Sequence, residues 1–422
     1  MKMRLLVIFV LSMQLFASDF NSNDGAPIRQ GVHIEWYRTI APGYNGEGIF
    51  VWSDTRFGMR NIFAHKIDQD GNLLWGDNGA VITNLPGRQE DPVAITDGAG
   101  GAFIAWVDYR FDAQGDIFLQ HEDNNGDILL DSNGVALAQV NGKQITINMC
   151  TDSLGGAFIT WQDNRGGVDD DIYGTHISSD HLIVEPGSGV SIVTEGGNQN
   201  AKTIEYAGSN QAFIAWADFR EGANADIYGQ RLNMDMSGLF EENGFPIAST
   251  SEQELKPRAT YVNNNISFLA WKRGDEDSKI LYQFINQAGA VFPDPKPIST
   301  NIALQTAPRV KRNSLGEVFV NFKDLRDDPI DGDQYFQKIN TEGDPQWGEG
   351  VRLDPVDDID FSARFTANTL GGVSVIWERG TFPDVDIFFQ NLTSDGNYSL
   401  VEPLAISNNL GYQFSPIISG DE

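Results

Sequence analysis

Short apolar runs return along the chain at a nearly fixed interval. The run Ala102–Val107 contains almost no polar residue; Asp108 and Arg110 follow it closely, and Asp116 opens the next run. Equivalent anchor positions lie 51 to 55 residues apart, at Trp52, Trp106, Trp161, Trp216, Trp271, Phe322 and Trp377. Seven copies of one unit of about 55 residues therefore fill the chain, and such a period is typical of β repeat architectures.

Each unit reads as four strands. In the second unit these are Pro92–Thr96, Ala102–Val107, Asp116–Gln120 and Val135–Ala138. An apolar run of this length without alternation indicates a strand that is buried on both faces. Sheets packed side by side around an axis bury both faces of their middle strands, so the pattern predicts an all-β, seven-bladed β-propeller of four-stranded antiparallel blades.

A glycine with Asp or Asn follows most third strands, as in Asp70-Gly71-Asn72, and this combination is a hairpin signal. The third unit has Asp180-His181-Leu182 there instead. Near the C-terminus, Gln413–Ile418 repeats the opening strand of a unit. We expect this strand to pair with N-terminal material in a seven-bladed fold, because seven anchors are counted. Eight blades with the last one truncated are the alternative.

The N-terminus has the features of a secretory signal peptide. Lys2 and Arg4 precede the apolar run Leu5–Phe16, which is too short to span a bilayer, and Ala17 supplies a small residue for cleavage. We expect a signal peptide at 1–17, a polar leader at 18–33 and a single propeller domain at 34–422. The predicted location is secreted or at the cell surface, with a bacterial periplasm as the alternative.

Composition narrows the range of partners. The 29 basic and 59 acidic residues give a net charge of −30, which disfavours nucleic acid and anionic membranes as partners through long-range repulsion. No other stretch is long and apolar enough for a membrane span, and we expect a monomer. Cys150 is the only cysteine, so no intrachain disulfide can form.

A polar device returns in most units. Asp108 and Arg110 follow the anchor Trp106, Asp116 opens the next strand, and several other units repeat this arrangement. Catalysis requires one asymmetric constellation, whereas a feature present in every blade indicates a structural role. We therefore predict that the arginine pairs with the strand-opening aspartate across its own hairpin, since charges at least half buried are kept with partners.

The fifth to seventh units depart from this repeated arrangement of Asp and Arg and together contain more basic residues than the other units. Eleven basic residues lie between Lys256 and Arg326, where the chain-wide frequency predicts about five. We hypothesise a patch for an anionic ligand such as an acidic glycan. Its predicted residues are Lys272, Arg273, Arg309, Lys323 and Arg379. The competing interpretation is a degenerate blade whose charges lie on separate solvated faces.

Signals for a metal or a nucleophile are weak. Asp68, Asp70 and Asn72 have the alternating oxygens of a calcium loop, but the distal glutamate is missing. No cofactor is expected, and calcium is the alternative. Among the five histidines only His176 and His181 come near zinc spacing, so zinc is not expected. Cys150 lies in an alternating run, which predicts a buried, inert thiol.

The repeated elements W-x-D-x-R, as in Trp106 to Arg110, and D-I-[FY]-x-Q, as in Asp116 to Gln120, carry a family resemblance. The chain resembles bacterial exported β-propeller repeat proteins that are loosely grouped with sialidase-like folds. This resemblance implies the fold. The Asp-box pattern of sialidases is not present in these turns, so their catalytic roles have no positions here to be carried onto.

Two functions follow as expectations. The first is an exported, non-enzymatic binding or scaffold propeller that presents its loops to a glycan or protein partner, because a rigid repeat fold displays loops well. The alternative is a sialidase-like carbohydrate-active enzyme, either a glycoside hydrolase or a lyase. An enzyme should show a cluster of unique polar residues that breaks the repeat.

Overall fold

A computed structural model describes most of the chain. The described residues are 7–9, 35–43, 46–263, 265–354, 360–368, 370–381, 384–407 and 416–419. Strands are the only regular secondary structure in these ranges. Within them, no helix has the length and apolar character that crossing a membrane would require.

The N-terminal unit comprises Ile28–Ala259 with Asn286–Gly289. It contains four antiparallel sheets of four strands, each ordered as in the sequence. The first two sheets are β2 (Glu35–Pro42), β3 (Gly48–Asp54), β4 (Asn61–Ile67) and β5 (Ala80–Val81), then β6 (Gln89–Thr96), β7 (Ala102–Asp108), β8 (Asp116–Glu122) and β9 (Val135–Ala138). The next two are β10 (Gln144–Thr151), β11 (Ala157–Asp163), β12 (Asp171–Ile177) and β13 (Val190–Val193), then β14 (Gln199–Tyr206), β15 (Ala212–Asp218), β16 (Asp226–Leu232) and β17 (Phe245–Ala248).

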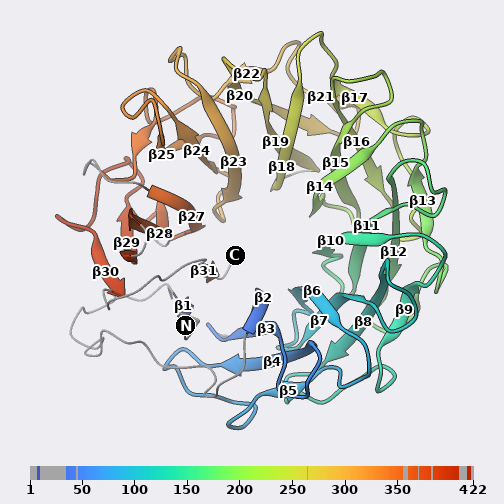
Figure 1. The fold of residues 1–422 in the computed structure, drawn as a ribbon. Helices are drawn as coiled ribbons and strands as arrows, with labels where there is room; N and C mark the ends of the chain where they lie inside the picture. The colour runs from blue at the N-terminus through green and yellow to red at the C-terminus, as the bar shows by residue number, and fades with distance from the viewer. Residues whose placement is uncertain are drawn as a thin grey trace. The chain divides into compact units, whose positions relative to one another are not determined.

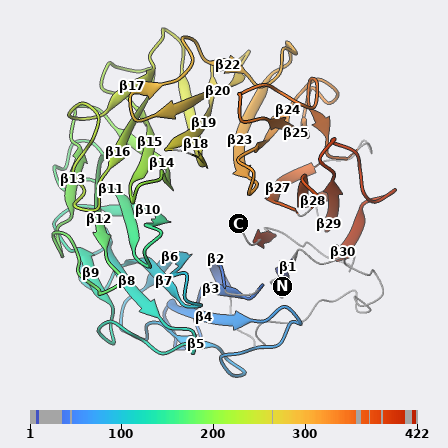
Figure 2. The ribbon, with the colours of Figure 1, turned by 180° about the vertical axis from the view of Figure 1, so that it is seen from behind.

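The C-terminal unit comprises Met1–Pro27, Thr260–Ile285 and Ala290–Glu422. The fifth sheet has β18 (Glu254–Asn263), β19 (Ile266–Arg273), β20 (Lys279–Asn286), β21 (Gly289–Ala290) and β22 (Lys296–Pro297), with β22 paired to β20. The sixth has β23 (Gln305–Arg312), β24 (Val318–Asp324), β25 (Asp333–Ile339) and β26 (Val351–Arg352). The seventh has β27 (Asp360–Ala367), β28 (Val373–Thr381), β29 (Asp384–Leu392) and β30 (Leu404–Ser407), and Figure 2 shows its strands in orange and red.

The predicted fold class is confirmed. Seven small antiparallel sheets follow one another along the chain, each with its strands in sequential order, as in a seven-bladed β-propeller. The four strands predicted for the second unit are β6 to β9, with ends that differ from the prediction by at most three residues. The division into two compact units leaves the single domain at 34–422 a prediction.

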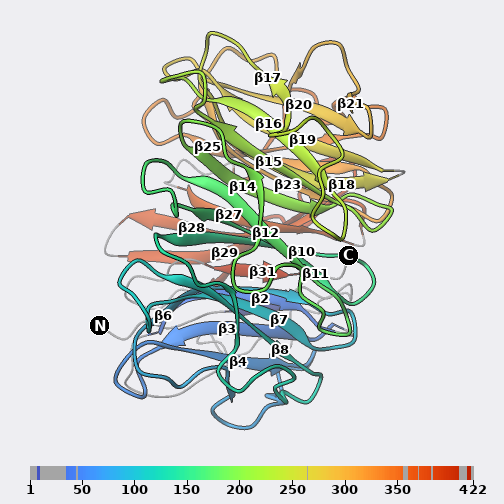
Figure 3. The same cartoon turned by 90° about the vertical axis from the view of Figure 1, so that its right-hand side faces the viewer.

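The second strands are buried because they lie between neighbouring sheets. Every residue of β3, β7, β11 and β15 is buried, and the six anchor tryptophans and Phe322 are at most 1% exposed. One apolar cluster joins Val51 and Ile62 of the first sheet to Ile104 and Trp106 of the second. Figures 1 and 3 show these two sheets in blue and cyan. Burial on both faces explains why these runs lack polar alternation.

A buried residue at the start of the opening strand joins one sheet to the previous one. Gln89, Gln144 and Gln199 are fully buried, and so is Gln305 in the C-terminal unit. Their backbone N–H groups donate to the carbonyl just before the third strand of the preceding sheet, at Arg60 (2.9 Å), Gly115 (3.0 Å), Asp170 (2.7 Å) and Ser278 (2.8 Å). We call these residues the junction glutamines.

The C-terminal strand pairs with N-terminal material, as the sequence suggested. β31 (Ile417–Ser419) forms a parallel two-stranded sheet with β1 (Val7–Phe9). β1 lies inside the segment 1–17 that the sequence predicts to be a signal peptide, rather than in the leader at 18–33.

Candidate functional site

The repeated polar device is a Trp-Asp-Arg cluster. In the third sheet, Trp161 Nε1 donates to Asp163 Oδ2 at 2.9 Å, and the backbone N–H of Arg165 donates to Oδ1 at 2.9 Å. The Arg165 guanidinium pairs with the same carboxylate at 2.6 Å. Asp163 is fully buried. The cluster recurs with Asp54, Asp108 and Asp218, and the sixth sheet keeps the Asp324–Arg326 pair with Phe322 in place of the tryptophan.

The arginine of each cluster is also held by two further contacts. Arg165 Cζ lies 3.7 Å from the ring centre of Tyr173 on the third strand, a cation–π contact. Its Nη2 donates to the carbonyl of Ser188 at 2.7 Å, so it joins the loop after the second strand to the turn before the fourth. The contacts of the guanidinium thus connect three segments of its own sheet, and the structural interpretation of the repeat follows.

The predicted partner of the arginine is wrong. Arg110 pairs with Asp108, two residues earlier, at 2.8 Å, rather than with the strand-opening Asp116. Burial and the charges of Asp112 and Asp108 raise the pKa of Asp116 to about 6. The same effects, with Asp169 and Asp163, raise the pKa of Asp171 to about 6. These aspartates are electrostatically strained because the local turn already satisfies the arginine.

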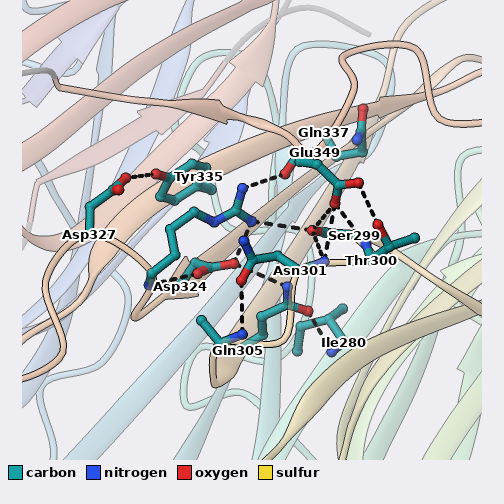
Figure 4. A network of polar contacts seen from close by, with 12 residues as sticks. Ile280, Ser299, Thr300, Asn301, Gln305, Asp324, Asp327, Tyr335, Gln337 and Glu349 are labelled. Atoms are coloured by element: carbon teal, nitrogen blue, oxygen red, sulfur yellow. Dashed lines mark hydrogen bonds and ion pairs between the residues drawn. The ribbon is translucent and has the colours of Figure 1, made fainter.

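Figure 4 shows the cluster of the sixth sheet together with the loop from the fifth. Gln305 Nε2 donates to Asp324 Oδ2 at 3.0 Å, and Arg326 Nη1 donates to the carbonyl of Glu349 at 3.0 Å. The Glu349 carboxylate accepts hydrogen bonds from Ser299 Oγ at 2.6 Å and from the backbone N–H of Thr300 at 2.7 Å. These donors lower the pKa of Glu349 to about 2. The network fastens two neighbouring sheets within the C-terminal unit.

The basic residues predicted to bind an anion are placed on several strands. Lys272 and Arg273 end β19, and Lys272 Nζ lies 3.6 Å from the Asp275 carboxylate. Arg379 on β28 pairs with the fully buried Asp354 at 2.6 Å and lies 3.6 Å over the ring of Phe388. Arg379 thus takes the place of the cluster arginine although its own sheet lacks the usual aspartate two residues earlier.

Arg309 and Lys323 lie on two paired strands of the sixth sheet, β23 and β24. Arg309 Nε donates to the carbonyl of Ala363 on β27 at 3.2 Å, beside Arg364. Arg309 and Arg364 occupy equivalent register positions, opposite Asn321 and Ile376. Burial lowers the pKa of Arg364, with the charge of Glu378 opposing the shift. Arg309 of the predicted patch thus lies beside Arg364, an arginine that the sequence did not single out, and the patch itself stays a prediction.

The predicted calcium turn is organised by its own backbone. Asp68 Oδ1 accepts from the N–H groups of Asp70 (2.9 Å) and Asn72 (2.8 Å), and Asn72 Nδ2 donates to Asp68 Oδ2 at 2.8 Å. The second sheet repeats the arrangement at Asp123. In the described part of the chain, no group of three or more histidine, cysteine or carboxylate side chains is arranged to hold a metal ion. Calcium at this turn stays a prediction.

Two buried titratable groups lie outside the repeat. Cys150 is buried, and burial raises the pKa of its thiol well above the usual value, so the predicted inert thiol is confirmed. Glu122 at the end of β8 is fully buried, and neither carboxylate oxygen has a hydrogen-bond partner among the described residues. Burial, with a smaller effect of Asp123, raises its pKa well above 4.5. The equivalent residues of the other sheets are Ile67, Ile177, Leu232, Ile285, Ile339 and Leu392.

Sequence reasoning missed a set of exposed aromatic residues on the first two sheets. Phe57 and Phe111 directly follow the cluster arginines Arg56 and Arg110, and they are 50% and 58% exposed. Both pack at their bases on an aromatic residue of the third strand, Phe63 at 5.7 Å and Phe118 at 5.9 Å. The corresponding positions in other sheets hold Gly166, Glu221 and Asp327.

Further side chains of the same loops extend this surface. Met59, in the loop of Phe57, is 52% exposed. Arg88, in the connection between the two sheets, has its Cζ 3.8 Å from the ring centre of Tyr109. We call Phe57, Met59, Arg88, Tyr109 and Phe111 the aromatic loop patch. The signal in the sequence was a phenylalanine after W-x-D-x-R in two units only.

Comparison with known proteins supports the fold. No family model matches the sequence, and no curated protein matches it. The solved polysaccharide lyase Uly1 is similar with a TM-score of 0.53 and 8% identity over 85% of this chain and 90% of that chain. A puromycin-hydrolyzing peptidase of Mycobacterium tuberculosis is similar with a TM-score of 0.52 and 11% identity over 87% of this chain, which spans 53% of the peptidase.

A sialidase, NanB of Streptococcus pneumoniae, also matches, with a TM-score of 0.35 and 11% identity over 83% of this chain and 66% of that chain. Solved structures similar to this chain thus include sialidases and polysaccharide lyases. At these identities the similarity shows the fold alone.

Proposed function

We propose that the protein is an exported, non-enzymatic binding propeller that recognises a glycan chain through the aromatic loop patch. The observation that carries the proposal is the exposure of Phe57 and Phe111 at equivalent positions of two neighbouring sheets. Large apolar side chains that gather on a surface mark binding sites, whereas single ones do not.

The chemistry of the patch suits a sugar. An aromatic face offers an apolar surface to the C–H groups of a pyranose ring, and the guanidinium of Arg88 offers a fork of donors to hydroxyl or carboxylate oxygens. Phe57 and Phe111 are held at their bases by Phe63 and Phe118, so little side-chain entropy is lost on binding. The polysaccharide lyase of similar fold gives a second, weaker reason to test polysaccharides.

The enzymatic alternative has less support. The polar clusters recur from sheet to sheet, and a repeated cluster offers no asymmetric acid and base. Asp116 and Asp171, with a pKa of about 6, have the acidity of a general acid, but they share the repeat. Release of reducing or unsaturated ends from any polysaccharide by the purified protein would favour the hydrolase or lyase.

The experiment is native gel electrophoresis of the mature protein in gels that contain one soluble polysaccharide each, neutral or anionic. We expect retardation by at least one polysaccharide and its loss in Phe57→Ala/Phe111→Ala. Burial of a phenylalanine is worth about 1.5–3 kcal/mol, so even partial coverage predicts at least about tenfold weaker binding. The matched control is Val168→Ala/Ile330→Ala, which shortens two residues that are 88% and 85% exposed.

A second ligand class is favoured by one observation, the position of Arg309 and Arg364 on neighbouring strands. Paired guanidinium groups recognise carboxylate or sulfate, so this site would select an acidic glycan. If only anionic polysaccharides retard the protein and Arg309→Ala abolishes the effect, the binding site lies in the C-terminal unit. Lys311→Ala, on the same strand, is the control. Equal migration of wild type and both sets of variants in every gel would refute glycan binding at either site.

A further inference from the structure

A cationic or imidazole side chain lies at the same place near the end of most third strands. Lys66, His121, His176, Arg231 and Lys338 occupy this position. Four of them pair with an acidic residue in the turn between the first two strands of their own sheet. His121 Nε2 lies 3.1 Å from Asp97 Oδ2, and His176 Nε2 lies 2.9 Å from Asp152 Oδ2. The second and third sheets thus carry matching Asp–His pairs.

The second sheet differs from the third because another imidazole faces its histidine. His121 Nδ1 lies 2.8 Å from His181 Nε2, which belongs to the turn after β12 in the third sheet. The rings meet edge to face with centres 5.1 Å apart, and Phe103 stacks on His121 at 4.0 Å. Both histidines lie in the N-terminal unit.

The register of the repeat explains why His181 points at the preceding sheet. The equivalent turn residue of the fourth sheet, Met236, is buried in an apolar cluster with Ile172 and Ile192 of the third sheet. His181 has φ of 64°, a left-handed conformation, where four other turns place glycine with φ of 78° to 83°. These are Gly71, Gly126, Gly343 and Gly396. A non-glycine residue there costs of order 1 kcal/mol, and Met236 has the same φ of 64°.

Hydrogen bonds hold the two facing nitrogens toward each other. His121 Nε2–H donates to Asp97 Oδ2 at 3.1 Å, so His121 Nδ1 carries a lone pair in this tautomer. His181 Nε2 lies 2.8 Å from that nitrogen, so its N–H donates to His121 Nδ1. Asp97 also accepts hydrogen bonds from the backbone N–H groups of Ala99 and Gly101, which fix the carboxylate behind His121.

From this geometry we propose that His121 and His181 form a two-histidine site for a borderline transition-metal ion such as Zn²⁺ or Ni²⁺. Asp97 holds the first ligand from behind, in the carboxylate–histidine–metal arrangement that orients metal-binding imidazoles. On metal binding the proton of His181 moves from Nε2 to Nδ1, so that His121 Nδ1 and His181 Nε2 both coordinate the ion, and water fills the other coordination positions. Metal–nitrogen bonds of about 2.0–2.1 Å place two tetrahedral ligands roughly 3.3 Å apart, so the turn has to open by only about half an ångström.

The test is isothermal titration of the mature protein, freed of metal by chelator, with Ni²⁺ and with Zn²⁺. We expect one saturable equivalent for wild type, loss of that equivalent in His181→Gly and His121→Gln, and about 10- to 100-fold weaker binding in Asp97→Asn. His176→Gln is the matched control, because His176 has the same backing aspartate but no facing imidazole in the contacts described; it should bind as wild type does.

Two results would overturn the proposal. One is the absence of a saturable equivalent in wild type, and the other is binding by His181→Gly as tight as that of wild type, which would assign the ion to surface carboxylates. His181→Gly restores the residue of the other turns, so it should keep the fold even if His121→Gln does not. Circular dichroism and the melting temperature of each variant check this point.

Discussion

The buried carboxyl of Glu122 predicts that a single apolar substitution stabilises the protein. Glu122 is fully buried, and its two carboxylate oxygens accept no hydrogen bond from the described residues. All six equivalent positions in the other sheets hold Ile or Leu. A buried polar group without a partner costs about 1–3 kcal/mol. Glu122→Leu removes this cost and keeps a side chain of similar volume.

The gain should grow with pH. The pKa of Glu122 is raised in the folded protein, so the unfolded chain loses its proton first, near the ordinary value of 4.5. Above that pH the folded state holds a proton that the unfolded state has released, and stability falls as pH rises, by about 1.4 kcal/mol per pH unit until the folded carboxyl also ionises. Glu122→Leu does not carry this penalty.

The assay is unfolding in guanidinium chloride, followed by tryptophan fluorescence, at pH 5, 6, 7 and 8. We expect Glu122→Leu to unfold at a higher denaturant concentration than wild type at every pH, with the largest difference at pH 8. Glu122→Gln keeps a buried polar group but cannot ionise, so it should remove the part of the pH dependence that Glu122 causes and recover only part of the stability. A lower midpoint for Glu122→Leu, or a difference that does not change with pH, would refute the reasoning.

Three further changes test the repeated clusters by the same unfolding assay. Asp163→Ala leaves Arg165 and Trp161 without their common acceptor and should lower the free energy of unfolding by about 3–5 kcal/mol. The control Asp344→Ala removes an exposed pair with Lys296 and should lower it by less than about 1 kcal/mol. Equal losses of stability in the two variants would contradict the role of the cluster. Asp116→Asn introduces the residue type of the equivalent position in the first sheet, Asn61, and should stabilise the protein at pH 7–8 but not at pH 4. The reason is that a carboxyl with its pKa raised to about 6 destabilises the fold only at a pH where the same group has ionised in the unfolded chain. No gain in stability at pH 8 would argue against the electrostatic strain at Asp116. Gly134→Ala should cost about 2–5 kcal/mol, since its φ is 73° and a Cβ there would lie 2.4 Å from Trp106 Cη2; a neutral effect would show that the indole can move.

Periodic burial made the fold predictable. The anchor tryptophans and the unbroken apolar runs come from strands covered on both faces, and no other environment produces them at a period near 55 residues. Strand ends were equally clear at Ala102 and Val135, where a glycine-containing turn precedes the strand. The number of sheets followed from the same count of anchors.

Contacts between side chains were harder to predict. The pairing of Arg110 with Asp108 is a local turn contact, and spacing along the chain did not distinguish it from a pair across the hairpin. The basic residues of the fifth to seventh units are close in sequence, but their spacing did not reveal that Arg379 pairs with the buried Asp354. An anion-binding patch formed by these residues stays a prediction.

The same limit explains the two missed features of the N-terminal unit. His176 and His181 came nearest to zinc spacing because they are five positions apart in the sequence, yet the turn after β12 carries His181 onto the preceding sheet, where it meets His121. Phe57 and Phe111 carried no predicted role. Only comparison between repeats, position by position, identifies the units in which a residue type departs from the others.

The junction glutamines imply a chain of nearest-neighbour couplings. Each one joins the first strand of its sheet, through a backbone hydrogen bond, to the residue just before the third strand of the preceding sheet. Loss of one such bond should therefore destabilise the two sheets that it joins and leave distant sheets folded. Gln144→Pro, which removes the backbone N–H that donates to Gly115, is then expected to speed amide exchange in β6 to β13 more than in β23 to β26. Unfolding would begin as fraying at the weakest joint and pass along the chain sheet by sheet.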